Sequence, residues 1–459
     1  MRGFLASSIG VTCAAALALP LTLPAAAGTA SAPPAQPTSG ARSAPTTAEP
    51  ALPSSTESLP LAPRTSDRTL GAAPEQGLTR DDVHRFSLVG VTWSDPDTEL
   101  RGRVQVRTRA TDTGEWSGWQ DIDTHNEDHG ADPGTAERDS GRVHGSTAPL
   151  WVGDSDGVDV RVKADTAAAR AVENTTRTAE TTTRAVENTT RTVENRSSPL
   201  PAGLHLELVD PGAEAPPAGA RPTANRASGT PLAATELPAL SKQATERELV
   251  ALRGKAQPYI GPRPRIVTRH GWGADEKLRE KGFVYTKKVK AAFVHHTATG
   301  NNYRCSQAPS VIRGIYRYHV ESSGWRDIGY NFLVDKCGTI YEGRAGGVTK
   351  AVMGAHTLGF NTDSMGIAVL GTFGSAKPSS AAVNAIARLT AWKLGLYGVN
   401  PRGKTYLKSG GGNLYRKGKN VRLNVISGHR DGFATECPGR QLYGKLGSAR
   451  STSARFQGR

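Results

Sequence analysis

Hydrophobic and polar residues alternate in several short stretches of the N-terminal half of this 459-residue chain. Side chains that point to opposite faces at successive positions are typical of strands with one buried face. Glycine and aspartate separate these stretches, as expected for turns between short strands. We therefore expect a small all-β, sandwich-like domain over residues 83–210, with strands at residues 86–93, 103–107, 158–162 and 204–208.

The C-terminal half mixes two hydrophobic periods. Short apolar runs predict strands, and apolar residues that recur every three to four positions predict two amphipathic helices. This mixture is typical of an α/β sheet with helices packed on it, which we expect at residues 259–447. The expected strands are residues 291–297, 330–334, 339–342, 366–370 and 424–427, and the expected helices are residues 308–320 and 380–396.

Segments without a hydrophobic period flank and separate these domains. Residues 33–82 are rich in Pro, Ala, Ser and Thr, which predicts a disordered linker. We expect a second linker at residues 211–258 and a tail at residues 448–459. Residues 166–198 carry a Thr-rich seven-residue repeat inside the β-rich domain. Strong apolar residues fall at only one repeat position, whereas a coiled coil needs two, so we predict an inserted loop.

The first 32 residues are typical of a secretory signal peptide. A basic start precedes an apolar run over residues 4–23, and small residues follow, with cleavage expected after Ala27 or Ala32. The alternative is an uncleaved membrane anchor. No later stretch approaches the roughly 20 apolar residues that a spanning helix needs. We therefore expect a secreted protein, extracellular or associated with a cell wall, without a transmembrane segment after cleavage.

The cysteine count supports a disulfide outside the signal segment. Cys13 leaves with the signal peptide, and Cys305, Cys337 and Cys437 remain. An odd number of cysteines in a secreted protein suggests one pair and one thiol with a separate role. If Cys437 binds a metal, Cys305 and Cys337 are free to pair in an oxidising compartment. The alternative is two free thiols.

Charge is divided unevenly along the chain. Residues 259–459 hold 32 Lys and Arg against 10 Asp and Glu, a net charge of +22, whereas the whole chain has a net charge of +15. A basic domain attracts polyanions over long range. For a secreted protein we expect anionic cell-wall polymers as partners, and no nucleic acid. The alternative is a solubilising surface charge without a partner.

One loop carries the strongest chemical signal. Residues 428–439 read GHRDGFATECPG and place His429 eight residues before Cys437. Upstream, the pair His295 and His296 ends an apolar run. Two imidazoles and one thiolate form a zinc site with three protein ligands and a fourth position open for water, which is the arrangement of catalytic sites. The alternative is a buried cysteine and unrelated core histidines.

These residues belong to a wider resemblance. Six stretches, in order over about residues 259–447, resemble the peptidoglycan recognition protein family and its zinc-dependent type 2 N-acetylmuramoyl-L-alanine amidases. They are residues 265–273 (RIVTRHGWG), 294–297 (VHHT), 324–332 (GWRDIGYNF), 341–344 (YEGR), 354–357 (GAHT) and the 428–439 loop. More than half of the chain lies outside the resemblance or matches it loosely.

The resemblance implies a fold, a reaction and a metal. The fold is a mixed central sheet flanked by helices, with a groove across it. The reaction is hydrolysis of the amide between N-acetylmuramic acid and the L-alanine of the peptidoglycan stem peptide. The zinc ligands are His295, His429 and Cys437, and His296 should face away because adjacent strand residues point to opposite faces. The alternative function is a non-catalytic peptidoglycan sensor or a wall-anchoring protein, although non-catalytic relatives typically lack the cysteine ligand.

The resemblance also assigns roles around the metal. Tyr330 matches the catalytic tyrosine, whose phenol can donate a hydrogen bond to the oxyanion or hold the attacking water. Thr435 stands where relatives carry Lys or Thr, and its expected role is to orient the water or the tetrahedral intermediate. His356 and Asn361 match residues that line the peptide groove.

Arg344 has two open roles, a contact to a stem-peptide carboxylate or a structural ion pair. The residues that follow it, 345–348 (AGGV), depart from the family pattern that reads the third stem residue. The preference for diaminopimelate or lysine stems therefore cannot be carried over.

Overall fold

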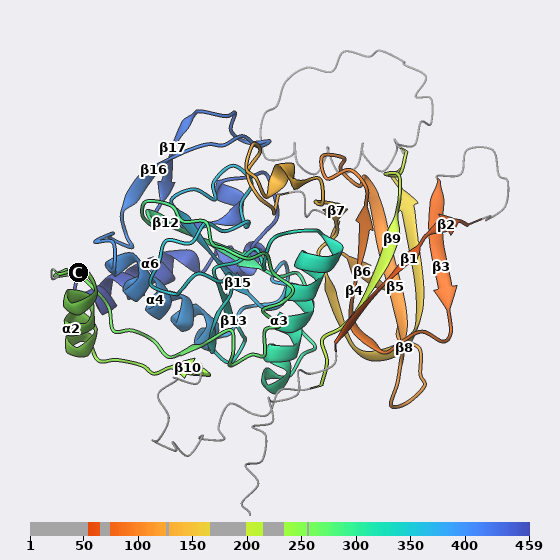
Figure 1. Cartoon of the computed structure of the whole chain (residues 1–459), viewed down its shortest axis with the longest axis horizontal. Helices are drawn as coiled ribbons and strands as arrows, with labels where there is room; N and C mark the ends of the chain where they lie inside the picture. The colour runs from red at the N-terminus through yellow and green to blue at the C-terminus, as the bar shows by residue number, and fades with distance from the viewer. Residues whose placement is uncertain (1–53, 65–73, 125–127, 166–198, 214–233, 255–256) are drawn as a thin grey trace, which may run out of the picture. The chain divides into compact units, whose positions relative to one another are not determined.

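The computed structural model describes residues 54–64, 74–124, 128–165, 199–213, 234–254 and 257–459. They form a β-rich N-terminal domain and an α/β C-terminal domain (Figure 1), which confirms the predicted fold class. The expected signal peptide and the heptad-repeat insertion lie outside these residues. None of the helices in the described ranges is both long and apolar enough to span a membrane.

Nine strands form the N-terminal domain within the described residues. They are β1 (Ser55–Pro60), β2 (Ala62–Pro63), β3 (Glu75–Arg80), β4 (Phe86–Trp93), β5 (Gly102–Ala110), β6 (Gln120–Ile122), β7 (Gly145–Ser146), β8 (Leu150–Ala164) and β9 (His205–Asp210). The sheet runs β1-β9-β4-β8-β3-β2, while β5 pairs with β6 and β8, and β7 pairs with β4.

The long strand β8 joins the parts of this domain. Its first residues pair with β4, and the residues from Val158 onward pair with β3 on one edge and with β5 on the other. Val158, Val160 and Val162 are fully buried, as are Val104 and Val106 of β5. The alternation seen in the sequence therefore marks the core face of these strands.

The predicted linker over residues 33–82 is wrong in its described part. β1 pairs antiparallel along β9, and β3 pairs antiparallel along β8. Leu59 and Leu78 are the apolar residues that these two strands direct to the core, and both are only half-buried. β1 lies at the edge of the sheet, and β3 is flanked on its outer side only by the two-residue strand β2. Such peripheral strands are ordered by main-chain hydrogen bonds to a neighbour, which leave little hydrophobic pattern in the sequence.

The C-terminal domain is built on a seven-stranded mixed sheet. Its order is β10 (Glu236–Leu237), β11 (Ile266–Val267), β14 (Ile340–Glu342), β13 (Phe332–Val334), β15 (Ser364–Val369), β12 (Ala291–His296) and β18 (Ile426–Gly428). β12 lies between β15 and β18 and is parallel to both. β13 is antiparallel to β14 and parallel to β15. β16 (Lys404–Lys408) and β17 (Asn420–Asn424) form a separate hairpin.

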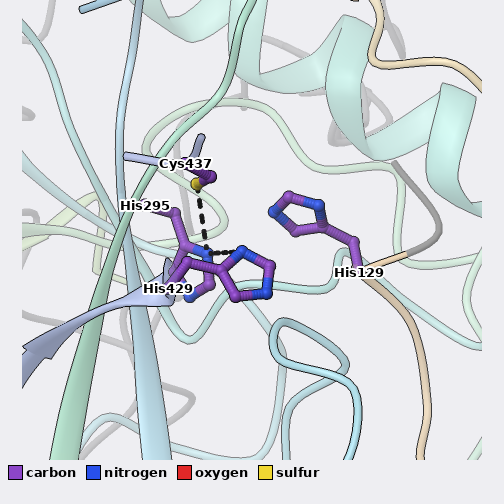
Figure 2. A group of neighbouring side chains, drawn as sticks. All are labelled: His129, His295, His429 and Cys437. Carbon is purple, nitrogen blue, oxygen red and sulfur yellow. Dashed lines mark hydrogen bonds between the residues drawn. The ribbon is translucent and has the colours of Figure 1, made fainter. Parts of the chain in front are cut away.

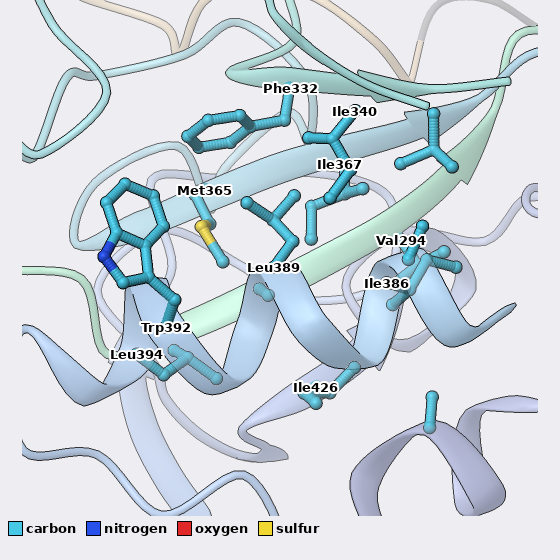
Figure 3. Close-up of a cluster of buried hydrophobic side chains, with 14 of the residues drawn as sticks. Val294, Phe332, Ile340, Met365, Ile367, Ile386, Leu389, Trp392, Leu394 and Ile426 are labelled. Carbon is cyan, nitrogen blue, oxygen red and sulfur yellow. The ribbon is translucent and has the colours of Figure 1, made fainter. Parts of the chain in front are cut away.

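Helices cover both faces of this sheet, as alternate residues of β13 show. Phe332 and Val334 pack in one cluster with α4 (Ser380–Gly395) and α6 (Leu446–Gln457), shown in part in Figure 3. Leu333, between them, packs in a second cluster with α3 (Ala308–Arg317). That second cluster also contains Leu88 of β4, so α3 lies beside the N-terminal domain (Figure 1).

Further helical segments complete the fold. They are α2 (Lys242–Arg253), α5 (Arg440–Tyr443), a π-turn η3 (Tyr318–Ser322) that continues α3, and the 3₁₀ turns η1 (Arg138–Ser140), η2 (Cys305–Gln307) and η4 (His429–Asp431).

Two further sequence predictions are corrected by helices. α2 lies within the predicted linker 211–258, and α6 contains most of the predicted tail 448–459. The hydroxyl of Ser241 caps α2 by accepting from the Ala244 amide, and Leu249 is its one apolar residue in the core. α6 buries mainly small and polar residues against α4, so its apolar stripe is too weak to recognise in the sequence.

Cys305 and Cys337 form a disulfide between η2 and the turn that joins β13 to β14, in agreement with the prediction from the cysteine count. Cys437 is a buried free thiol. The sequence separation is 32 residues. Closing a loop of this length restricts the unfolded chain, so the double variant Cys305→Ala/Cys337→Ala should lose about 3–4 kcal/mol of unfolding free energy. Denaturant titration measures this loss, and a change below about 1 kcal/mol would contradict it.

Candidate metal centre and substrate groove

His295, His429 and Cys437 come together at the end of the central sheet. β12 ends with His295 and His296, and the neighbouring strand β18 ends one residue before His429. The Arg430 amide donates to the Cys437 carbonyl at 3.0 Å and folds the loop back. Nδ1 of His295 consequently lies 3.0 Å from Nδ1 of His429 and 3.8 Å from Sγ of Cys437 (Figure 2).

The Nε2 atoms of His429 and His295 point away from the cluster, and each has a partner that orients its ring. Nε2 of His429 lies 3.1 Å from the main-chain oxygen of Asp128, which can only accept, so this nitrogen carries the proton and Nδ1 presents a lone pair. Nε2 of His295 lies 3.4 Å from Oγ1 of Thr357. Such outer partners are typical of metal-binding histidines.

Two imidazole nitrogens and one sulfur that converge in this way fit zinc in number and in type. Burial also sets the protonation states of the two imidazoles and of the thiol. Burial lowers the pKa of His295 well below its usual value, and it lowers the pKa of His429 to about 3 despite the opposing Asp128 carboxylate. Burial raises the pKa of the Cys437 thiol well above its usual value. The imidazoles are therefore neutral and able to bind a metal, whereas the thiol loses its proton only to a cation that binds it.

A third histidine, His129, joins this cluster from the N-terminal domain. Its ring centroid lies 4.6 Å from that of His429 and 5.3 Å from that of His295. The candidate ligand atoms of all four residues lie within 4.8 Å of one another. Nδ1 of His129 is 2.7 Å from Oδ1 of Asp128, and its buried Nε2 has no hydrogen-bond partner among the described residues. In Figure 2 the ring faces the other three side chains from a separate segment.

His129 carries no recognisable signal in the sequence. It precedes β7 in a segment without a metal-binding motif, and it reaches the centre only through contacts between the domains. No local spacing could have linked it to Cys437.

The comparisons with known sequences match two separate parts of the chain, one in each structural domain. Residues 285–440 match the family described as N-acetylmuramoyl-L-alanine amidase. Residues 38–187, which include His129, match the family described as Rv3811 N-terminal galactose-binding domain-like.

The identity and coverage of individual relatives establish the family. Peptidoglycan-recognition protein SC2 of Drosophila simulans is 30% identical over 200 residues, which are 43% of this chain and 92% of that protein. Peptidoglycan-recognition protein SC1a of Drosophila melanogaster is 33% identical over 192 residues, which are 41% and 87% of the two chains. The chain belongs to the peptidoglycan recognition protein family. The solved structure of Drosophila PGRP-LB is 26% identical, with 40% of this chain and 93% of that chain covered and a TM-score of 0.32.

In this peptidoglycan recognition protein, Tyr330 and Thr435 both lie beside the metal cluster. The ring centroid of Tyr330 lies 5.5 Å from that of His295. Oγ1 of Thr435 accepts from the Cys437 amide at 3.1 Å. Both residues line a pocket of about 120 Å³ together with His129 and Cys437. Burial raises the pKa of Tyr330 well above its usual value, and nearby Cys437 and Asp128 raise it further, so the phenol stays protonated.

His296 does not join the cluster. Its Nδ1 accepts from the Phe373 amide at 3.4 Å, and its ring is buried. His296 also lines the pocket beside His129, Tyr330 and Cys437, so its expected orientation away from His295 stays a prediction.

The three predicted groove residues are buried, and two of them contact the N-terminal domain directly. Asn361 donates from Nδ2 to Oδ1 of Asp132 at 2.7 Å, while its Oδ1 accepts from the amides of His356 and Thr357. The ring centroid of His356 lies 5.2 Å from that of His295.

Arg344 forms an ion pair, which is one of the two roles that the sequence left open. Its guanidinium donates to both carboxylate oxygens of Glu137 at 2.9 and 2.8 Å. The two side chains are 4% and 2% exposed, so the pair is almost fully removed from water. The partner carboxylate comes from the N-terminal domain rather than from the amidase-like domain itself.

Proposed function

We propose that this protein is a secreted zinc-dependent N-acetylmuramoyl-L-alanine amidase that hydrolyses the bond between N-acetylmuramic acid and the L-alanine of the peptidoglycan stem. The observation that carries this proposal is the convergence of His295, His429 and Cys437 beside Tyr330. The matched amidase family and the peptidoglycan-recognition relatives support it.

His295, His429 and Cys437 would hold the zinc ion. A bound zinc ion polarises the scissile carbonyl and makes a nearby water more acidic. The protein itself orients the reactants. The protonated phenol of Tyr330 would donate a hydrogen bond to the oxygen on which negative charge develops, and a donor already in place stabilises that charge without reorganisation. The Thr435 hydroxyl, next to Cys437, would orient the attacking water.

The charge of the C-terminal domain fits a wall-bound substrate. Its net charge of +22 would concentrate the enzyme on anionic wall polymers. We propose these polymers as secondary partners, and the muropeptide stem as the substrate that enters the groove near His356 and Asn361.

Product analysis tests the proposed reaction. The zinc-loaded protein should release stem peptides with a free L-alanine amine from purified peptidoglycan, and leave glycan strands with a free lactyl carboxylate. Mass spectrometry of the soluble and insoluble fractions detects both products, and a Tyr330→Phe sample is the matched control. A protein that retains muropeptides and releases neither product would instead be a non-catalytic binding module.

A further inference from the structure

A segment of the N-terminal domain occupies the proposed substrate groove. Residues 128–143, between β6 and β7, are here named the groove segment. At its start, the Leu358 amide donates to the Asp128 carbonyl at 2.9 Å, and the Gly130 amide donates to the Ala355 carbonyl at 3.2 Å. The main chain of the groove segment therefore lies directly against residues 355–358, beside His356.

Carboxylates of the groove segment satisfy the polar groups of the groove. Oδ1 of Asp132 accepts from the Gly359 amide at 2.8 Å and from the Asn361 amide group at 2.7 Å. Further along, Glu137 forms the buried ion pair with Arg344 and accepts from the Arg326 amide at 3.2 Å. An acidic peptide is thus bound where the resemblance places an acidic stem peptide.

Apolar contacts close the remaining space. Ala131 and Val143 of the groove segment pack with Trp325 and Ala355 in a cluster whose members are at most 7% exposed. A second peptide cannot bind these groups while the groove segment is in place, because interiors packed at normal density leave no room for one.

The position of His129 adds a chemical block to the steric one. Zinc sites with four protein ligands are closed, whereas catalytic sites keep one position open. His129 offers an unpartnered buried nitrogen to the same point as His295, His429 and Cys437. Asp128, the preceding residue, holds the outer nitrogens of both His129 and His429.

We propose that the groove segment is an intramolecular inhibitor: His129 supplies a fourth protein ligand to the zinc ion, the segment fills the stem-peptide groove, and cleavage requires it to leave. This inference rests on the proposed amidase function. The proposal also predicts that an acidic peptide displaces the groove segment, because the carboxylates of such a peptide can replace those of Asp132 and Glu137.

The coordination of the metal tests the ligand assignment without reference to activity. X-ray absorption of the zinc-loaded full chain should show three imidazoles and one sulfur, and the His129→Ala variant should show two imidazoles and one sulfur. His84→Ala, an exposed histidine of the same domain, is the control and should match the parent protein.

Turnover of a soluble muropeptide tests the inhibition. His129→Ala should raise turnover by about 10- to 100-fold, within the usual range of couplings between a regulatory element and a site. Glu137→Gln should raise it as well while keeping three imidazoles on the metal, because it weakens the contacts of Glu137 with Arg344 and Arg326 and leaves His129 unchanged. Asp139→Asn, an exposed carboxylate of the groove segment, is the matched control and should have no effect.

Metal coordination and turnover, measured together, distinguish a failure of this inference from a failure of the proposed amidase function. Unchanged coordination in His129→Ala would overturn the fourth-ligand assignment. Unchanged turnover in both His129→Ala and Glu137→Gln, from a chain that does cleave muropeptides, would overturn the inhibition and leave the amidase function standing. Loss of one imidazole in His129→Ala, without cleavage by any variant, would support the ligand assignment and refute the amidase function.

Discussion

Replacing Cys437 by alanine is expected to abolish muropeptide cleavage and to weaken zinc binding at least about 100-fold. This is the upper end of the loss seen when a residue that only hydrogen-bonds a metal ligand is removed. Cys437 contributes the only anionic donor among His129, His295, His429 and Cys437. The site is buried, with Cys437 4% exposed and His295 fully buried. Without the thiolate, the divalent cation would have only neutral imidazoles as ligands. The nearby anion would then be the buried Asp128 carboxylate, which contacts two of these rings, so the direct charge pairing at the metal would be lost.

Competition with a chelator measures zinc affinity in the parent and in Cys437→Ala. The Cys305→Ala/Cys337→Ala variant is the matched control, since it removes two sulfur atoms that belong to the disulfide and should keep its zinc. Zinc affinity equal to that of the parent in Cys437→Ala would contradict the assignment of Cys437 as a ligand.

Replacing Tyr330 by phenylalanine is expected to lower turnover by about 10²–10³-fold, the usual cost of losing one oxyanion donor. The ring of Tyr330 packs among the histidines of the site, so phenylalanine keeps the packing and removes only the hydroxyl. Because the lost hydrogen bond forms in the transition state, zinc content and muropeptide affinity should not change.

Turnover, zinc content and muropeptide affinity should be measured on the same Tyr330→Phe preparation, both in the parent and in the His129→Ala background. The matched control is Tyr341→Phe, a buried strand tyrosine whose hydroxyl donates to Asp335 instead of facing the metal cluster. Equal turnover in Tyr330→Phe and the parent would show that Tyr330 is structural, and Thr435 would then be the next residue to test.

The strands and helices that were recognised in the sequence are those whose side chains form the cores. β12 and β15 are fully buried along their length, and α4 buries apolar residues at helical spacing. β1, β3, α2 and α6 bury few large apolar side chains, and their sequences therefore predict linkers or a tail. Their order comes from strand pairing, capping and packing of small residues, which are weak signals in a single sequence.

The sequence by itself determined the two domain types, the disulfide pair and the group of residues His295, His429 and Cys437. The domain types follow from local periodicity, the disulfide pair from the cysteine count, and the choice of His295 as a ligand from the family resemblance. The structure brings those three residues together as the motifs suggested, and their roles in zinc binding and catalysis are the predictions stated above.

Only the tertiary structure placed His129, Asp132 and Glu137 against buried groups of the C-terminal domain. Each is an ordinary residue of a segment without a motif, and its significance depends on which buried groups it meets. From the sequence alone, Arg344 could pair either with a substrate or with another residue of the protein. In the fold it pairs with Glu137, because a buried guanidinium needs a carboxylate at hydrogen-bond distance. Contacts between domains that are far apart in the chain are set by packing and by charge pairing in three dimensions, which no local spacing encodes.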